Sequence, residues 1–195
     1  AELRSPMSNE PMGSRLTANV RARSTIEKLV RTGVLGGDKA ERWLARLKDE
    51  EKVKAMRTRA EGGDAGAMRI LGIWYHSGKH GLEQDDAAAY GWYKRGADLG
   101  EASCMWQVGQ RLAVGYGVEQ SITYGVMLVT QGAYGGSAGA ADFLGKRFDR
   151  GHHGLPKDLA QAKAWYEKVA SAKERDINAE RIESAARRAR ELSNV

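Results

Sequence analysis

Residues 67–78 read AMRILGIWYHSG, and the same pattern returns at 104–115 as CMWQVGQRLAVG and at 140–151 as AADFLGKRFDRG. In each copy, small or apolar residues stand at the first, fifth and ninth places, a spacing that puts them on one face of a helix. A glycine ends each stretch, which is typical of the left-handed residue that terminates a helix. The pattern therefore predicts three copies of one helix, spaced by 37 and then 36 residues.

A second helix is predicted after the first and third copies. The sequence HGLEQD at 80–85 leads to Trp92-Tyr93, and HGLPKD at 153–158 leads to Trp165-Tyr166 at the same offsets. Each copy is thus expected to be a helical hairpin, with the aromatic pairs in the core between hairpins.

The middle copy departs from this pattern. It keeps Gly117-Val118 and Ser121 but has Leu128-Val129 where the aromatic pair stands in the other two copies. Its second helix is therefore expected to pack differently. In all three copies an N-cap residue precedes the second helix, because Asp and Ser side chains accept hydrogen bonds from its free amides. These residues are Asp85, Ser121 and Asp158.

A glycine recurs inside each first helix, as Gly72, Gly109 and Gly145. Glycine within a helix costs about 1 kcal/mol relative to alanine. A cost that recurs with the repeat indicates that a neighbouring helix passes too close to leave room for a Cβ atom.

The combined pattern is similar to the Sel-one-like repeat, a relative of the tetratricopeptide repeat with a slightly longer period. The resemblance covers three repeats, at 64–99, 100–135 and 136–172. It implies an all-α fold, an α-solenoid of helix-turn-helix repeats. It also implies a non-catalytic adaptor or scaffold that presents a concave groove to a protein or peptide.

The flanks are expected to close the ends of the solenoid, since an open terminal repeat would leave its apolar face in water. Capping-box patterns at Ser24 and Asp38 predict helices near 25–32 and 39–61, and hence a capping hairpin over 21–63 that is a degenerate repeat. A last amphipathic helix is predicted over 178–192, within a C-terminal cap at 173–195. Residues 1–20 are expected to be a disordered tail, and residues 1–6 could be a cloning scar.

Composition excludes several classes of protein. The 195 residues are 42% hydrophobic and 29% charged, a globular balance, and no apolar run approaches the length of a membrane span. No signal-peptide pattern opens the chain, which favours a cytoplasmic location, although a leader could have been removed. The single cysteine, Cys104, excludes an intramolecular disulfide, and it occupies a small buried slot of the repeat.

The net charge of +6 belongs to the N-terminal third, where residues 1–60 carry 14 Lys and Arg against 8 Asp and Glu. One interpretation is a solvated helix face, and two others are contact with an acidic partner and binding of nucleic acid. Trp43 is the only aromatic residue there that could stack on bases, and Asp49-Glu50-Glu51 interrupts the basic stripe.

Catalysis, metal binding and cofactor binding are not predicted. All four histidines lie at or beside predicted turns, and His80 and His153 occupy corresponding repeat positions. The glycine-rich segments follow no strand and precede no Lys-Ser or Lys-Thr pair, so they are not phosphate loops.

The resemblance also implies which residues face a partner, because the first helix of each hairpin lines the concave surface of tetratricopeptide-like solenoids. Trp74 and Trp106 are the expected anchors, since they break the repeat phase, although both could simply pack against a neighbouring helix. The partner is a protein or peptide, acidic if basic residues on this face select it, and the chain is expected to be a monomer. The predicted binding residues are Arg69, Ile73, Trp74, His76, Trp106, Gln110, Arg111, Asp142, Lys146 and Arg147.

Overall fold

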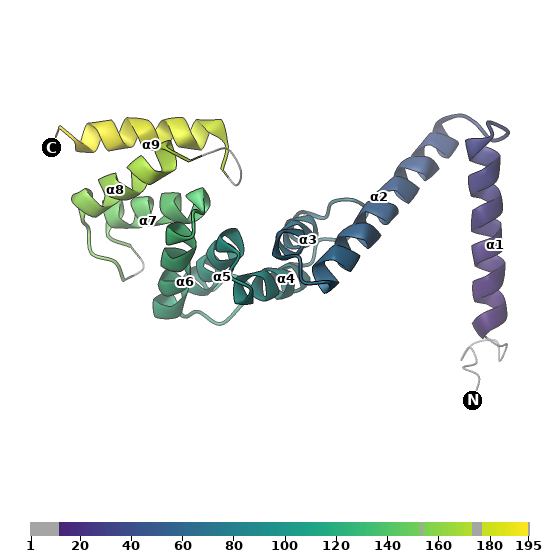
Figure 1. Ribbon diagram of the computed structural model, residues 1–195, viewed down its shortest axis with the longest axis horizontal. Coiled ribbons are helices and arrows are strands. Elements are labelled where there is room, and N and C mark those ends of the chain that lie inside the picture. The colour runs from purple at the N-terminus through teal and green to yellow at the C-terminus, as the bar shows by residue number, and fades with distance from the viewer. Residues whose placement is uncertain (1–11, 153, 173–176, 195) are drawn as a thin grey trace. The chain divides into compact units, whose positions relative to one another are not determined.

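The computed structural model describes residues 12–152, 154–172 and 177–194, and over these ranges the chain is all-helical, with no strand (Figure 1). His153 lies outside the described residues. The chain divides into two compact units, residues 1–52 and 53–195, and α2 contributes to both. The helices are α1 (Met12–Arg31), α2 (Asp38–Glu61), α3 (Ala65–Ser77), α4 (Asp86–Asp98), α5 (Ala102–Val114), α6 (Ile122–Tyr134), α7 (Ala138–Arg150), α8 (Leu159–Ala170) and α9 (Ala179–Leu192).

In the N-terminal unit, α1 begins at Met12, earlier than the start near residue 25 that the sequence predicted. Residues 12–20 are therefore helical instead of disordered, and residues 1–11 lie outside the described part of the chain. The physical reason is that no proline follows Met12 within this segment, and the turn-forming residues there are too scattered to stop a helix.

Among residues 22–52, for which the structure describes side-chain burial, few side chains are buried. Val30 of α1 and Leu47 of α2 are buried, and Arg23 forms an ion pair with Glu50. The turn between the helices contains Gly33 and Gly37 in the left-handed conformation, which glycine adopts without steric cost.

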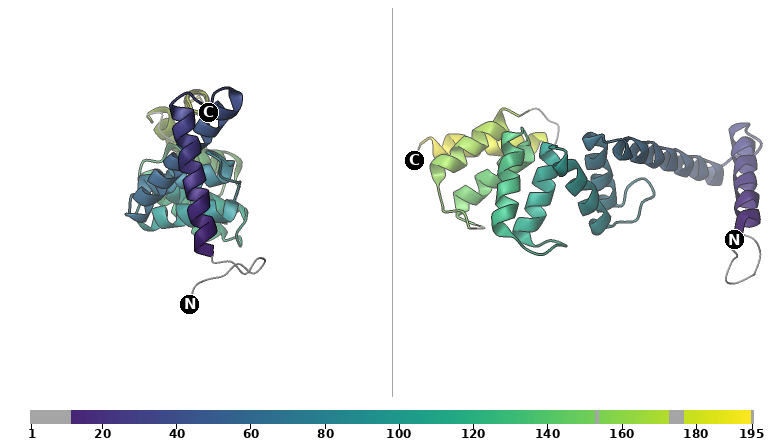
Figure 2. Two further views of the ribbon diagram at one scale, coloured as in Figure 1. Left: turned by 90° about the vertical axis from the view of Figure 1, so that its right-hand side faces the viewer. Right: turned by 60° about the horizontal axis from the view of Figure 1, so that its bottom comes forward.

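The C-terminal unit contains the three predicted hairpins, α3–α4, α5–α6 and α7–α8, followed by α9. Consecutive helices pack side by side along this unit, as the two further views also show (Figure 2). Gly78, Gly115 and Gly151 end the three first helices in the left-handed conformation, as predicted.

Two of the three predicted N-caps make the expected hydrogen bond. The carboxylates of Asp85 and Asp158 accept hydrogen bonds from the backbone N–H groups of Ala88 and Gln161, each at 2.9 Å. Ser121 occupies the N-cap position of α6, but its side chain makes no capping hydrogen bond. The prediction of a capping interaction is therefore wrong for the middle repeat.

The central glycines are close to their neighbours in two different ways. A Cβ atom at Gly72 or Gly145 would meet the ring of Tyr93 or Tyr166, at 2.4 and 2.9 Å respectively. At Gly109 it would instead lie 2.6 Å from the backbone carbonyl oxygen of Gly125. The expected close approach of a helix backbone therefore holds for the middle repeat, and in the outer repeats an aromatic ring fills the space.

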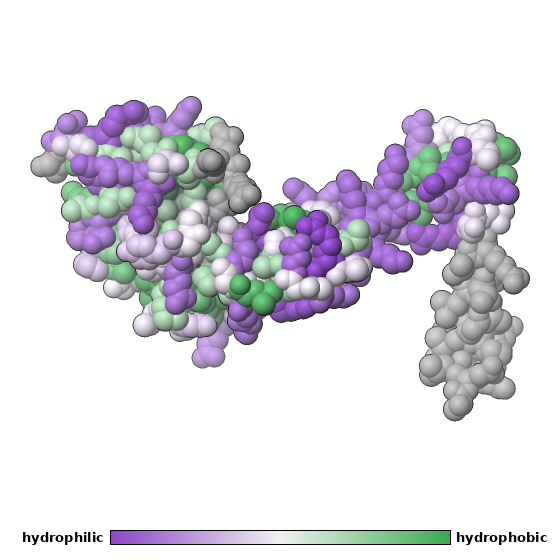
Figure 3. Space-filling model, in the orientation of Figure 1, coloured by the Kyte–Doolittle hydropathy of each residue, from purple (hydrophilic) through white to green (hydrophobic). Residues whose placement is uncertain are grey.

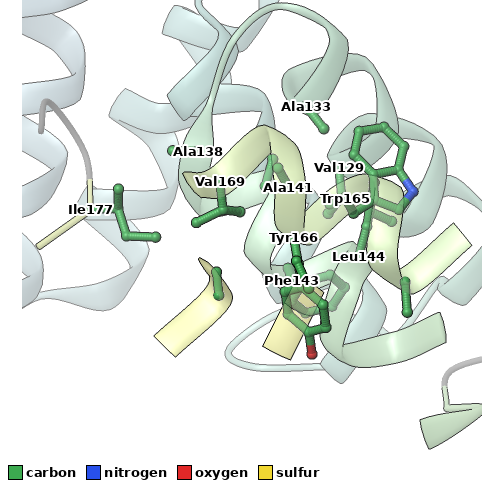
Figure 4. Close-up of a cluster of buried hydrophobic side chains, with 14 of the residues drawn as sticks. Val129, Ala133, Ala138, Ala141, Phe143, Leu144, Trp165, Tyr166, Val169 and Ile177 are labelled. Carbon is green, nitrogen blue, oxygen red and sulfur yellow. The ribbon is translucent and has the colours of Figure 1, made fainter. Parts of the chain in front are cut away.

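The largest cluster of buried side chains runs from α5 to α9 and includes Val129, Leu144, Trp165 and Tyr166 (Figure 4). The last helix contributes Ala185, Ala189 and Leu192, and Ile182 packs against the same cluster. These four residues form the apolar face that the sequence predicted for this helix.

At the other end of the unit, a smaller cluster joins the last turns of α2 to the first repeat. Ala60 is fully buried with Ala67 and Leu71 of α3, and Met56 packs against them. This contact covers the apolar face of α3, which is what a capping helix has to do.

Candidate functional site

Three of the predicted binding residues line one groove between α3 and α5. The groove has a volume of about 260 Å³ and is lined by His76, Gln107, Gln110, Arg111, Val114 and Tyr116. His76 comes from the last turn of α3, whereas the others come from α5 and the residues just after it. The side chains of Val114 and Tyr116 remain about half exposed, so the groove combines apolar surface with amide and imidazole groups.

The carboxylate of Asp86, in the first turn of α4, holds one side of this groove together. Its Oδ1 atom lies 2.6 Å from Nδ1 of His76, and its Oδ2 atom accepts a hydrogen bond of 3.1 Å from the Tyr116 hydroxyl. The hydrogen bond with His76 is the main reason that the pKa of Asp86 lies below its ordinary value. Asp86 and Tyr116 were not among the predicted residues. In the sequence, Asp86 directly follows the N-cap residue Asp85, and Tyr116 stands between two glycines. These placements are the signals that could have identified the two residues.

Arg111 lies at the base of the groove and is only 6% exposed, so it does not face outward as predicted. Its guanidinium lies over the rings of Tyr93 and Tyr116, with centroid distances of 5.0 and 5.9 Å, and donates a hydrogen bond of 2.9 Å to Gln107 Oε1. Its Nε atom is buried and has no hydrogen-bond partner among the described residues. Stacking on the two tyrosine rings and the hydrogen bond to Gln107 therefore hold the Arg111 side chain against α4 and α5.

The two predicted tryptophan anchors lie apart from this groove and from each other. Trp74 packs against the cluster that joins α2 to α3, and its ring meets the His80 ring edge-on at 4.4 Å. Trp106 packs against the largest cluster, where a Cβ atom at Gly139 would lie 2.6 Å from its ring. Its indole N–H is buried and has no acceptor in the part of the chain that the structure describes. Both indoles therefore have packing roles, and they do not form one binding surface.

The three predicted residues of α7 also differ in their exposure and contacts. Asp142 is 2% exposed and accepts hydrogen bonds from Lys146, at 2.9 Å, and from Arg181 of α9. Lys146 is exposed. The guanidinium of Arg147 lies 4.5 Å from the centre of the Phe143 ring, and burial lowers its pKa. Asp142 thus joins α7 to α9, and it does not present its charge to a partner as predicted.

The remaining two predicted residues lie in α3. Arg69 forms an ion pair of 3.7 Å with Glu101 and lines a separate depression of about 360 Å³ at the starts of α3, α5 and α7. Ile73 is partly buried against the cluster that contains Tyr93. Sequence reasoning placed the ten residues on one concave face, whereas the structure distributes them over separate depressions and packed clusters.

Among the described residues, no group of three or more His, Cys, Asp and Glu side chains could hold a metal ion. Cys104 is fully buried, and burial raises the pKa of its thiol. No described helix is both long enough and apolar enough to cross a bilayer. The basic N-terminal segment pairs several of its arginines with acids, such as Arg31 with Glu27 and Arg46 with Glu50. Neither this arrangement nor the comparisons below support nucleic-acid binding.

The fold and its grooves define an α-solenoid of helical hairpins. A model of the Sel1 repeat matches residues 65–101, 102–137 and 138–173, which is more than half of the chain. The chain therefore belongs to the Sel1 repeat family, as its sequence pattern predicted. The matched repeats begin within two residues of the predicted ones. Proteins of this family generally mediate protein–protein interactions and are generally non-catalytic.

Solved structures and a curated relative agree with this assignment. A Sel1 repeat protein from Oxalobacter formigenes is 29% identical, with a TM-score of 0.54 over 70% of this chain and 98% of that one. A protective antigen of uropathogenic Escherichia coli with an SLR fold is 23% identical, with a TM-score of 0.52 over 80% of this chain and 32% of that one. The ERAD-associated E3 ubiquitin-protein ligase component HRD3A of Arabidopsis thaliana is 32% identical over 73 residues. That match covers 37% of this chain and 11% of the relative.

Proposed function

We propose that the protein is a non-catalytic adaptor that binds a segment of a partner protein in the groove between α3 and α5. The observation that carries this proposal is the convergence of His76, Gln110, Val114 and Tyr116 on one groove. Half-exposed apolar side chains beside polar groups that fix orientation are the composition of a peptide-binding surface. The adaptor role also agrees with the general role of the family.

Hydrogen-bonded and buried side chains support the base of the groove. The Asp86 carboxylate bridges His76 and Tyr116, and the buried Arg111 side chain fills the space below. Preorganised side chains reduce the entropy lost when a partner binds. Hydrolysis by the His76–Asp86 pair would need a nucleophilic side chain beside it. The nearby Ser77 hydroxyl instead donates its hydrogen bond to the carbonyl oxygen of Ile73.

The test is an affinity capture from the native extract with two matched variants. Val114→Lys places a charge in the groove, and Met127→Lys places one on α6, where Met127 is 46% exposed compared with 47% for Val114. We expect a partner that wild type and Met127→Lys retain and that Val114→Lys loses. Equal retention by both variants would exclude this groove as the binding site. Light scattering of the purified chain tests the accompanying proposal that it acts as a monomer.

A further inference from the structure

A second and larger groove lies between α7 and α9. Its volume is about 550 Å³, and it is lined by Asp142, Lys146, Asp149, Arg150, Lys157, Tyr166, Ser184, Ala185, Arg187, Arg188 and Glu191. The space-filling view shows hydrophilic residues over much of α9 (Figure 3). The groove is therefore a polar surface, unlike the half-apolar groove between α3 and α5.

The carboxylates at the floor of this groove are already neutralised. Asp142 accepts hydrogen bonds from Lys146 and Arg181. Asp149 accepts two from the Arg188 guanidinium, at 2.9 and 2.8 Å, and these are the main reason that its pKa lies below the ordinary value. Both acids are part of the contact between α7 and α9, so they do not cancel the charge of the other cations.

Three cations at the groove have no such partner. Arg150, Lys157 and Arg187 are exposed, and none of them forms an ion pair with any residue in the described ranges. Counting Arg181, which contacts Asp142, six cationic side chains meet three carboxylates around this groove. Repulsion from Arg150 also contributes to the lowered pKa of Arg147. The cations around this groove thus outnumber the carboxylates by three, which gives it a net positive charge.

We infer that the groove between α7 and α9 binds an acidic segment, rich in Glu and Asp, of a partner protein. The carboxylates of a flexible segment can adjust their distances from one another, so that they can pair with Arg150, Lys157 and Arg187 at the same time. A nucleic acid fits less well, because Tyr166, which is the only aromatic side chain among the described residues that line the groove, is buried and offers no face for a base to stack on. The inference rests on the proposed adaptor function and adds a second surface to it.

Fluorescence anisotropy with the full chain tests the inference. The probe is a fluorescein-labelled peptide of alternating Glu and Gly, and the reference is the same peptide with Gln in place of Glu. We expect saturable binding of the Glu peptide alone, weakening as salt rises because the contacts are exposed charge pairs. Arg150→Glu with Arg187→Glu should weaken binding about tenfold or more.

A matched variant separates this groove from the overall charge of the chain. Lys54→Glu with Lys79→Glu makes the same change in net charge at two exposed residues, in α2 and just after α3, that lie outside the groove. It should weaken binding less than about twofold, since salt screens distant charges. Equal weakening by the two pairs would overturn the inference. It would also be overturned if the Glu peptide did not bind, or if an oligothymidylate of equal charge bound more tightly.

The outcome is independent of the groove between α3 and α5. The probe peptide is defined, so its binding does not require the native partner. If the chain binds the Glu peptide but captures no partner that depends on Val114, this inference stands and the proposed function fails. If the chain captures such a partner but does not bind the Glu peptide, the proposed function stands and this inference fails.

Discussion

The middle repeat and the two outer repeats solve the same packing problem with different residues. In the outer repeats, the first helix has a glycine where a tyrosine ring of the second helix lies, Gly72 with Tyr93 and Gly145 with Tyr166. In the middle repeat the ring is replaced by Val129. The small side chain leaves room for the two helices to approach until their backbones touch.

The contact in the middle repeat depends on a second glycine. Gly125 of α6 stands where the outer repeats have Ala89 and Ala162. A Cβ atom at Gly125 would lie 2.5 Å from the backbone nitrogen of Ala113 and 2.7 Å from the carbonyl oxygen of Gly109. The comparison shows that repeats with the same spacing of residues can pack in two ways. In the outer repeats a ring packs against a glycine, and in the middle repeat one helix backbone packs against another.

The largest effect is expected at Gly125. Gly125→Ala should lower the free energy of unfolding by about 3 kcal/mol, because the added methyl group would overlap backbone atoms that cannot rotate away. Chemical denaturation of the full chain measures this. Gly91→Ala is the control, since Gly91 is a helical glycine with no atom near its missing Cβ, and we expect it to leave stability unchanged or raise it by up to about 1 kcal/mol. A loss at Gly125 no larger than about 1 kcal/mol would mean that the backbones do not touch.

A smaller effect is expected at Gly145, where the obstacle is a ring. Gly145→Ala should cost about 2 kcal/mol in wild type but less in a Tyr166→Val background, because valine restores the space that the middle repeat has. A double-mutant cycle by denaturation should give a coupling on the order of 1 kcal/mol. Additive effects would show that the ring is not what excludes a side chain at this position.

A still smaller difference in stability between the repeats is expected when their N-cap side chains are removed. Asp85→Ala and Asp158→Ala should each destabilise the chain by about 1 kcal/mol, since each removes a hydrogen bond to a helix amide. Ser121→Ala should cost at most a few tenths of that, because its side chain makes no capping bond. Thermal melts of the three variants compare the caps directly, and equal losses would contradict the difference.

The smallest effect concerns pH. Arg188 lowers the pKa of Asp149 below its ordinary value of 3.8, so the pair stabilises the fold above pH 3.8. This contribution is lost as the pH falls through the lowered pKa of the folded state. Asp149→Asn should reduce the acid-induced loss of stability below pH 4 by less than about 1 kcal/mol. The middle repeat has the small side chain of Ala113 at this position. Ser184→Ala, which changes an exposed residue of α9 that does not titrate, is the control that leaves the pH profile unchanged. An unaltered profile in Asp149→Asn would mean that the pair contributes nothing to acid sensitivity.

The sequence predicted the architecture well because its evidence is local. Helix faces, terminating glycines and the caps at Asp85 and Asp158 depend on residues within one or two turns of each other, and each signal recurs in two or three of the repeats. The departure of the middle repeat was also visible, since Leu128-Val129 replaces an aromatic pair. The start of α1 at Met12 was missed, because weak turn-forming residues do not mark a helix boundary.

The binding surface was predicted less well, because it depends on contacts between helices. Arg111 and Asp142 occupy positions that a repeat template assigns to the concave face, yet both are buried by residues outside their own helix. Tyr93 and Tyr116 cover Arg111, and Arg181, 39 residues away in the chain, pairs with Asp142.

The sequence by itself thus determined the repeat family, the hairpins and the terminal helix, because helix periodicity and capping are properties of short segments. Only the tertiary structure decided which charged side chains face solvent, which glycines meet a ring and which meet a backbone. Those outcomes depend on distances between helices, which the volumes of side chains on both partners set together.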